Sequence, residues 1–390
     1  MEAHPAPARS AATRWRAHAF ALKNSAANLD VDARNASTAA THITDMRFAD
    51  ALHRREEPIM VTSIMRLRSV SIMAVVALLL PLLGLNQASA AERLKPFELA
   101  YTTSGDMAQV VTQVEKRLTD HGFKIVGSYA PYTNAAFPEG ETVSAEVIGV
   151  TNPALLAAAA ETRFGGYAAV QRVTVTQVTS KGATQIQVAY TNPTYMANAY
   201  RLKSNLTDVA ADLGKALGTQ QAYGSRKGLT ASDLRDYHYK FLMPYFDDPH
   251  HLAKYDSHEQ AVSAVKAGLA AHNGGTSEVY EVAIPGKQQT VFGVALSGPA
   301  GNKCSGDQYI MSRIDFKAPK STGHLPYDIL VSGDRVYALA VKFRIAINFP
   351  DLSMMGSNSF MSIMCAPGAI EKALKEAARG TAAATATQHS

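Results

Sequence analysis

The chain repeats one order of predicted elements, and this internal duplication constrains its fold more than any other feature of the sequence. The tetrapeptide at 106–109, DMAQ, predicts a helix start, because its first residue can cap the helix and its fourth can bond back to the cap. The tetrapeptide at 257–260, SHEQ, predicts the same start in the second half. Each helix then places apolar residues on one face and stops near a glycine, Gly122 or Gly274.

The segments after each helix match as well. Strands are predicted at 124–129, 147–150, 171–179 and 184–190 in the first half, and at 278–284, 291–294, 327–331 and 336–347 in the second. A turn that contains glycine joins the last two strands of each half, as in a hairpin. Helices predicted at 202–217 and 367–379 close the two halves. Sheets connected by hairpins are antiparallel. The predicted class is therefore α+β, with two similar β-α-β4-α units, each an antiparallel sheet with helices packed on one face.

This duplication sets the predicted domain boundaries. The first unit is expected at 91–218 and the second at 253–380, joined by a linker at 219–252. Within the linker, the segment 239–246 alternates imperfectly and is a candidate first strand of the second unit. The Ala/Thr-rich end, 381–390, is predicted to be disordered.

The segment 60–90 is predicted to be a signal peptide. Arg66 and Arg68 precede the apolar run 72–85, and the small residues 88–90, ASA, suit cleavage after Ala90. A spanning helix needs about 20 apolar residues, so this run is too short to anchor the chain. Residues 1–59 are expected to reflect a start codon assigned too early, or else a disordered extension. We therefore expect a periplasmic or secreted protein without membrane attachment.

Removal of residues 1–90 on export would lower the net positive charge of the protein. The formal net charge is +5 for the whole chain, of which residues 1–59 carry +1 and residues 60–90 carry +2, leaving +2 for residues 91–390. No cluster of Lys and Arg interleaved with aromatic residues occurs. Nucleic-acid binding is therefore not expected.

The first unit resembles the DUF302 domains, a small α+β family of undefined function. The resemblance lies in the helix region 105–122, the turn VTNP at 150–153 and the motif VAYTNPTYM at 188–196. It covers residues 95–218. Residues 253–379 match more loosely, since Ser297-Gly298-Pro299 replaces the Asn-Pro turn and a long loop follows. The resemblance implies a fold and assigns no catalytic residues.

Cys304 and Cys365 are predicted to form a disulfide. An even pair of cysteines in an exported protein most often forms a structural bridge, which here would hold the loop 298–324 against the last helix. The alternative is a redox thiol, because Cys365 precedes a predicted helix whose N-terminus would favour the thiolate. No C-x-x-C motif supports that alternative.

Soft metal ligands gather in two segments of the second half. They are Met354, Met355, Met361 and Met364 before the last helix, and His250 and His251 at the end of the linker. Thioether and imidazole groups suit Cu(I), so copper is an alternative cofactor. Methionine also fills gaps in cores, and one apolar helical face would explain the spacing of Met361 and Met364. We favour packing and predict no cofactor.

The linker also holds the candidate ligand site. It comprises Tyr237, His238, Tyr239, Tyr245 and Asp247. Aromatic residues beside a titratable histidine and carboxylates can line a pocket between two units. His238 with Asp247 and Asp248 would then serve an enzyme as acid and base. The competing interpretation is that the aromatic rings simply pack against both units.

No hydrolase, P-loop, dinucleotide or zinc-protease motif occurs in a fitting context. The leading hypothesis is a non-catalytic exported binding or accessory protein, whose site lies at the junction of the units or around 349–365. Its partner would be a small molecule or a periplasmic protein. The alternatives are a redox or copper-handling protein using Cys304 and Cys365 with nearby Met and His, and a small-molecule enzyme around His238.

Overall fold

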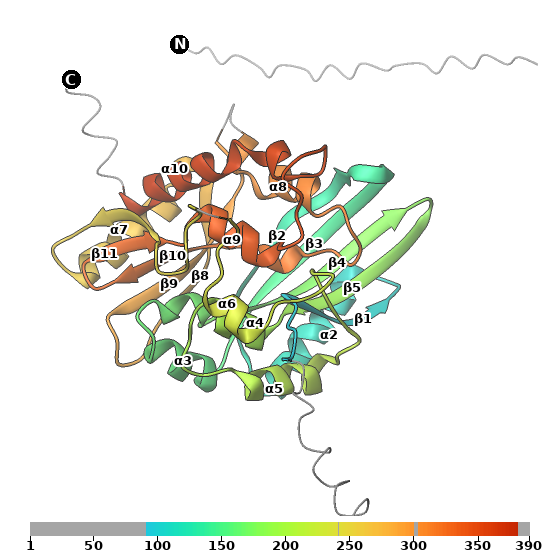
Figure 1. The fold of residues 1–390 in the computed structure, drawn as a ribbon, viewed down its shortest axis with the longest axis horizontal. Helices are drawn as coiled ribbons and strands as arrows, with labels where there is room; N and C mark the ends of the chain where they lie inside the picture. The colour runs from blue at the N-terminus through green and yellow to red at the C-terminus, as the bar shows by residue number, and fades with distance from the viewer. Residues whose placement is uncertain (1–90, 241, 300–302, 381–390) are drawn as a thin grey trace, which may run out of the picture. The chain divides into compact units, whose positions relative to one another are not determined.

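Two antiparallel sheets with helices account for the chain between the predicted signal peptide and the C-terminal tail (Figure 1). The computed structural model describes residues 91–240, 242–299 and 303–380. The predicted extension, signal peptide and tail lie outside these residues. In the described ranges, no helix has the length and apolar character needed to cross a membrane.

The first half contains six strands and four α-helices. In chain order they are β1 (Phe97–Thr103), α2 (Met107–Asp120), β2 (Lys124–Phe137), β3 (Glu141–Thr151), α3 (Pro153–Ala160), β4 (Gln171–Ser180), β5 (Ala183–Thr191), α4 (Pro193–Ala199), α5 (Thr207–Leu217) and β6 (Gln221–Tyr223). The short helix α6 (Ala231–Arg235) follows in the linker.

Among the described residues, the second half repeats this order up to its last helix. Its elements are β7 (His250–Lys254), α7 (His258–Ala270), β8 (Thr276–Ala283), β9 (Gln289–Leu296), α8 (Asp307–Ile314), β10 (Tyr327–Ser332), β11 (Arg335–Ala338), α9 (Val341–Asn348) and α10 (Ala366–Ala378). The strand orders are β2-β3-β4-β5-β1-β6 and β8-β9-β10-β11-β7, so the two sheets share one topology. The predicted fold class is confirmed. The predicted caps are present too, because Asp106 accepts from the Gln109 amide and Ser257 from the Gln260 amide.

Three predicted elements were wrong. No described residue of the linker segment 239–246 belongs to a strand, and the second sheet begins with β7. The strand predicted at 336–347 is β11 followed by the helix α9, and the helix predicted at 202–217 begins only at Thr207. The residues of α9 are buried on nearly every side, and a short apolar run of this kind has no periodicity to separate a helix from a strand.

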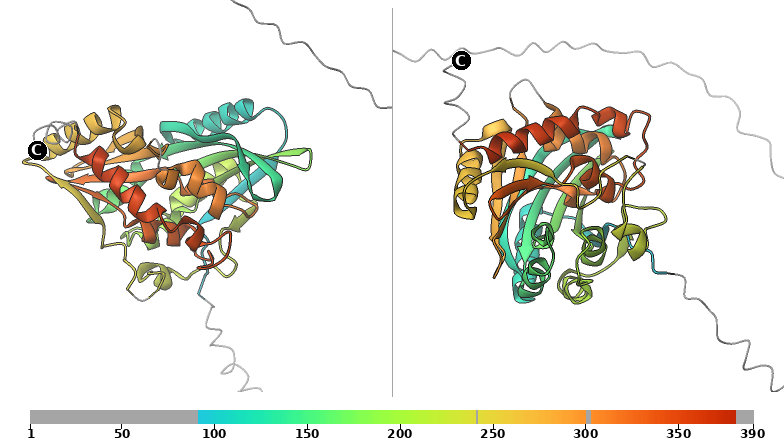
Figure 2. Two further views of the ribbon diagram at one scale, coloured as in Figure 1. Left: turned by 90° about the horizontal axis from the view of Figure 1, so that it is seen from above. Right: turned by 60° about the vertical axis from the view of Figure 1, so that its left-hand side comes forward.

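Helices cover the outer face of each sheet, and the other half covers the inner face. The helices α2 and α5 pack on the first sheet, while α7 and α10 pack on the second, with α10 (red) lying across it (Figure 1, Figure 2). The segment after α3 packs against β9 and β10, and the corresponding segment after α8 packs against β3, β4 and β5. Each half thus completes the core of the other.

Charged side chains meet where the inner faces touch. In the first sheet Arg172 lies opposite Gly149, and in the second Asp328 lies opposite Gly293. Arg172 and Asp328 therefore occupy equivalent positions in the repeat. They face each other across the junction, where Arg172 Nη2 donates to both carboxylate oxygens at 2.8 and 2.6 Å. Both side chains are almost completely buried.

A tyrosine and a glycine occupy another pair of equivalent positions. Tyr280 pairs with Gly293 and Gly127 pairs with Gly149, each just after a bulge in its strand. The Tyr280 ring packs on both partner glycines, where an added Cβ would lie 2.9 Å from it at Gly149 and 2.3 Å at Gly293. A Cβ on Gly127 would lie 1.9 Å from the Val279 carbonyl oxygen. The glycine on β2, which has no side chain, thus allows this strand to approach β8 closely beside the large side chain of Tyr280.

Cys304 and Cys365 form the predicted disulfide. The bridge joins the segment before α8 to the N-terminus of α10 across a sequence separation of 61 residues. It therefore fixes the long connection between β9 and β10 to the last helix.

Replacing Gly127 with alanine should destabilise the protein by about 2 kcal/mol or more, because the added methyl group meets backbone rather than a movable side chain. Urea denaturation measures this loss. Gly368→Ala is the control: its Cβ meets nothing within 4 Å, so stability should stay equal or rise slightly. Equal stability of the two variants would contradict the close approach of β2 and β8.

Removing the disulfide in a Cys304→Ala, Cys365→Ala double variant should cost up to about 4 kcal/mol, the chain-entropy value for a loop of this length. The same urea titration measures it. Thiol titration of the oxidised wild type should find no free thiol, and two free thiols would contradict the bridge.

Candidate functional site

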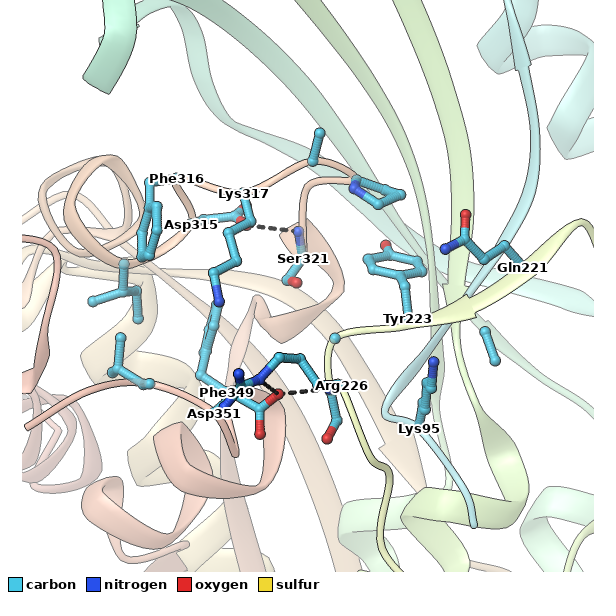
Figure 3. A pocket seen from close by; sticks show the side chains of 17 residues that line it. Lys95, Gln221, Tyr223, Arg226, Asp315, Phe316, Lys317, Ser321, Phe349 and Asp351 are labelled. Carbon is cyan, nitrogen blue, oxygen red and sulfur yellow. Dashed lines mark hydrogen bonds and ion pairs between the residues drawn. The ribbon is translucent and has the colours of Figure 1, made fainter. Parts of the chain in front are cut away.

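A cavity of about 300 Å³ opens at the junction of the two halves, and we call it the junction pocket (Figure 3). The first half contributes Lys95 and the edge strand β6 with the turn that follows it. The second half contributes the loop 314–319, Ser321 and the segment 349–352. The pocket therefore exists only while the halves are packed together.

Local pairing positions the first-half wall. The short strand β6 pairs with β1, with Tyr223 opposite Phe97, and the Tyr223 hydroxyl donates to the Lys320 carbonyl at 2.8 Å. Gly224 then turns with φ +93°, and a Cβ there would lie 2.7 Å from the Pro96 ring. Only glycine allows this turn, which carries Arg226 to the pocket rim.

Asp315 is a buried acid in the pocket lining. The residue is 2% exposed. Its Oδ1 accepts from the Ser321 amide at 2.8 Å, and its Oδ2 has no hydrogen-bond partner in the described part of the chain. Burial raises the pKa of Asp315 to about 7, and the nearby Lys320 ammonium only partly opposes this. Near neutral pH the group can therefore either donate or accept a hydrogen bond.

Cationic side chains line the rim. Lys95 and Lys317 lie on opposite sides of the pocket (Figure 3), and within the described ranges neither forms a hydrogen bond or an ion pair. The Lys317 ammonium lies 5.5 Å from the Phe316 ring centroid. Arg226 is held by Asp351, whose Oδ2 accepts from the Arg226 amide at 2.6 Å. The rim thus offers two ammonium groups that form no close ion pair within the described ranges. The Lys95 charge also acts on the Glu98 carboxylate, where it partly opposes the burial that raises the pKa of Glu98.

The predicted ligand residues lie elsewhere, along the linker. The Tyr237 hydroxyl donates to the Ala346 carbonyl at 3.2 Å and the Tyr239 hydroxyl to the Leu352 carbonyl at 3.0 Å. The His238 ring lies 4.5 Å from the Tyr245 ring, and Asp247 pairs with Arg201 at 2.8 Å. The two hydroxyl contacts dock the linker on the second half, and the Asp247–Arg201 ion pair docks it on the first. None of the five residues lines the junction pocket.

The methionines before α10 are mostly exposed. Met355 is 78% exposed, Met364 61% and Met361 47%, so the prediction that Met361 and Met364 pack on one apolar face was wrong. Met354 is partly buried beside Tyr239. His250 lines a groove together with Met243 and Met364. The His251 ring packs edge-on against Tyr337, with 5.5 Å between the ring centroids.

Sequence reasoning missed Lys95, Arg226, Asp315 and Lys317, because no motif marks them. The one available signal was the long connection 298–324 of the second unit, which is longer than the corresponding connection between β3 and β4 of the first. That connection supplies Asp315 and Lys317.

Comparison with protein families matches residues 99–219 to the family described as "Domain of unknown function DUF302". The match runs from within β1 to just past the end of α5 and leaves out the edge strand β6, so the chain contains a DUF302-like domain there. The match does not extend to the second half, whose relation to the first rests on the shared topology. No curated protein and no solved structure matches the chain significantly.

The raised pKa of Asp315 predicts a pH dependence of stability. The pKa of an aspartate in the unfolded chain is about 3.9. Between about pH 4 and pH 7 the native state therefore binds more protons than the unfolded state. The stability contributed by protonated Asp315 is complete below about pH 4 and is lost as the pH rises through 7. Asp315→Asn removes this titration. The melting temperature of the variant minus that of the wild type should therefore increase from pH 5 to pH 8. Thermal melts at a series of pH values measure this difference. A difference in melting temperature that stays constant across this pH range would contradict the raised pKa of Asp315.

Proposed function

We propose that the mature protein is an exported, non-catalytic binding protein that holds a small anionic molecule in the junction pocket. The observation that carries this proposal is that two ammonium groups without a close ion pair in the described ranges, Lys95 and Lys317, line the same pocket as the unsatisfied Oδ2 of buried Asp315. Buried polar atoms without partners are rare in folded proteins, and a ligand or ordered water would satisfy this one.

The chemistry of the pocket favours a compact ligand with one anionic group. Ammonium groups on two sides attract a carboxylate or phosphate, and charge-assisted hydrogen bonds to such groups are stronger than neutral ones. The side chains of Phe316, Phe349 and Tyr223 offer apolar surface for the ligand body. A volume of about 300 Å³ matches the smaller ligand sites of proteins. Asp315 would recognise a hydroxyl or amine on the same molecule.

Export is supported by two independent features. The segment 60–90 has the pattern of a signal peptide and lies outside the described residues. Both cysteines of the chain form one disulfide, which persists in oxidising compartments. A periplasmic or secreted location follows from these features as part of the proposal.

The enzyme hypothesis has weaker support. His238 packs against Tyr245, Asp247 pairs with Arg201, and Asp248 Oδ2 accepts from the Tyr245 amide, so each of these three groups already has a partner. The redox hypothesis requires Cys304 and Cys365 to cycle between bridge and thiols. The hydroxyl of Tyr309, in α8, lies 3.6 Å from the sulfur of Cys365, which precedes α10.

The proposal is tested by ligand binding to the purified chain 91–390. Thermal-shift screening with small probes (inorganic phosphate, citrate, malate, glycerate and glycerol phosphate) selects a ligand, and isothermal calorimetry then measures its affinity. Lys95→Gln and Lys317→Gln should each weaken binding at least about tenfold, and the wild-type affinity should fall as salt is added. Lys124→Gln is the matched control, because Lys124 is exposed at the start of β2 and does not line the pocket.

Two outcomes would contradict the proposal. One is that no anionic probe stabilises the wild type. The other is that Lys124→Gln weakens binding as much as the two pocket variants do, because the attraction would then come from the general surface charge.

A further inference from the structure

The same groove recurs at one position of both halves. Strand pairing establishes the correspondence: Glu98 lies opposite Tyr190, two residues before Asn192, and His250 lies opposite Ala338, two residues before Ala340. The first-half groove has a volume of about 220 Å³ and the second-half groove about 740 Å³. The equivalent lining positions are Glu98, Asn192, Thr194, Thr207 and Ala210 in the first half, and His250, Ala340, Lys342, Gly368 and Glu371 in the second.

Each groove is bounded by the segment that leads into the first strand of its half. In the first half this segment supplies Glu92 and Leu94, and in the second it supplies residues 242–245 and Asp248 of the linker. The architecture of the groove is therefore inherited with the repeat. Its chemistry differs between the copies.

The second copy has a histidine–carboxylate pair where the first has Glu98 and Ala210. His250 Nδ1 lies 3.5 Å from Glu371 Oε1. A carboxylate at Nδ1 favours the tautomer that carries its proton there, which leaves the Nε2 lone pair free to bind a metal ion. Histidines that bind metals commonly have such a carboxylate partner.

Two thioethers line the same groove. Met243 comes from the linker and Met364 from the segment before α10, so three separate segments contribute Met243, Met364 and His250 to the lining of one groove. Met364 is 61% exposed, so core packing does not explain it. Methionine side chains have three rotatable bonds and can adjust to a ligand.

This set of donors is soft. Among the described residues, no group of three or more His, Cys, Asp and Glu side chains is arranged to hold a metal ion. An imidazole nitrogen with thioether sulfurs suits Cu(I), whereas Zn²⁺, Mg²⁺ and Ca²⁺ favour thiolate, imidazole or oxygen ligands. We propose that the second-half groove binds one Cu(I) ion through His250 Nε2 and the sulfur atoms of Met243 and Met364.

The test is Cu(I) binding by the chain 91–390 with its disulfide intact. Cu(I) is kept reduced by ascorbate without oxygen and titrated against a chromophoric Cu(I) chelator, and a thiol assay confirms that no free cysteine contributes. The wild type should bind one Cu(I) per chain. His250→Gln, Met243→Leu and Met364→Leu should each lower the affinity at least about tenfold.

Met361→Leu is the matched control, since Met361 is an exposed methionine of the same segment that does not line the groove. Its affinity should equal that of the wild type. Met364→Leu keeps the test decisive if His250→Gln disturbs folding, because Met364 is mostly exposed.

Wild-type protein that binds no stoichiometric Cu(I) would overturn the proposal. So would a loss in Met361→Leu equal to the loss in Met364→Leu, because exposed thioethers would then bind copper without a site. The result is independent of the junction pocket, whose anion binding these variants should leave unchanged.

Discussion

One carboxylate, Asp328, holds the inner faces of the two sheets together. Arg172 of the first half donates to both of its oxygens, and Arg344 of the second half lies with Nη1 3.1 Å from Oδ2. The Tyr280 hydroxyl adds a third contact at 2.8 Å. Two buried guanidinium groups thus depend on one buried acid. Removing one partner from such a group typically costs about 3–5 kcal/mol, because a charge is then left buried without compensation.

This central contact determines where binding sites can form. With the inner faces packed together, each half covers the other with the segment that follows α3 or α8, the helix after the third strand of that half. The segment after α8 also meets β6 of the first half and so creates the junction pocket. The repeated grooves lie at the first strand of each half. The shared topology thus produces both a pocket between the halves and a pair of equivalent grooves with different lining residues.

The sequence predicted the features that depend on local rules. Helix caps at Asp106 and Ser257, hairpin turns and apolar periodicity indicated the duplication and the α+β class, and the compartment argument predicted the disulfide. The predictions from sequence failed where packing between distant segments determines the structure. The apolar run of α9 had the pattern of a strand because the helix is buried on nearly every side. Arg172 and Asp328 are separated by 156 residues, and no motif connects them before the halves are docked. The junction pocket was missed for the same reason.

The most direct test of this account is hydrogen exchange of the Asp328→Asn variant, read on peptides from both sheets. If the buried ion group joins the halves into one cooperative unit, protection should fall by a similar factor in β4 and β5 of the first half and in β9 and β10 of the second. A loss of protection confined to the second sheet, with the first sheet unchanged, would show that the halves are stable separately and would contradict the account.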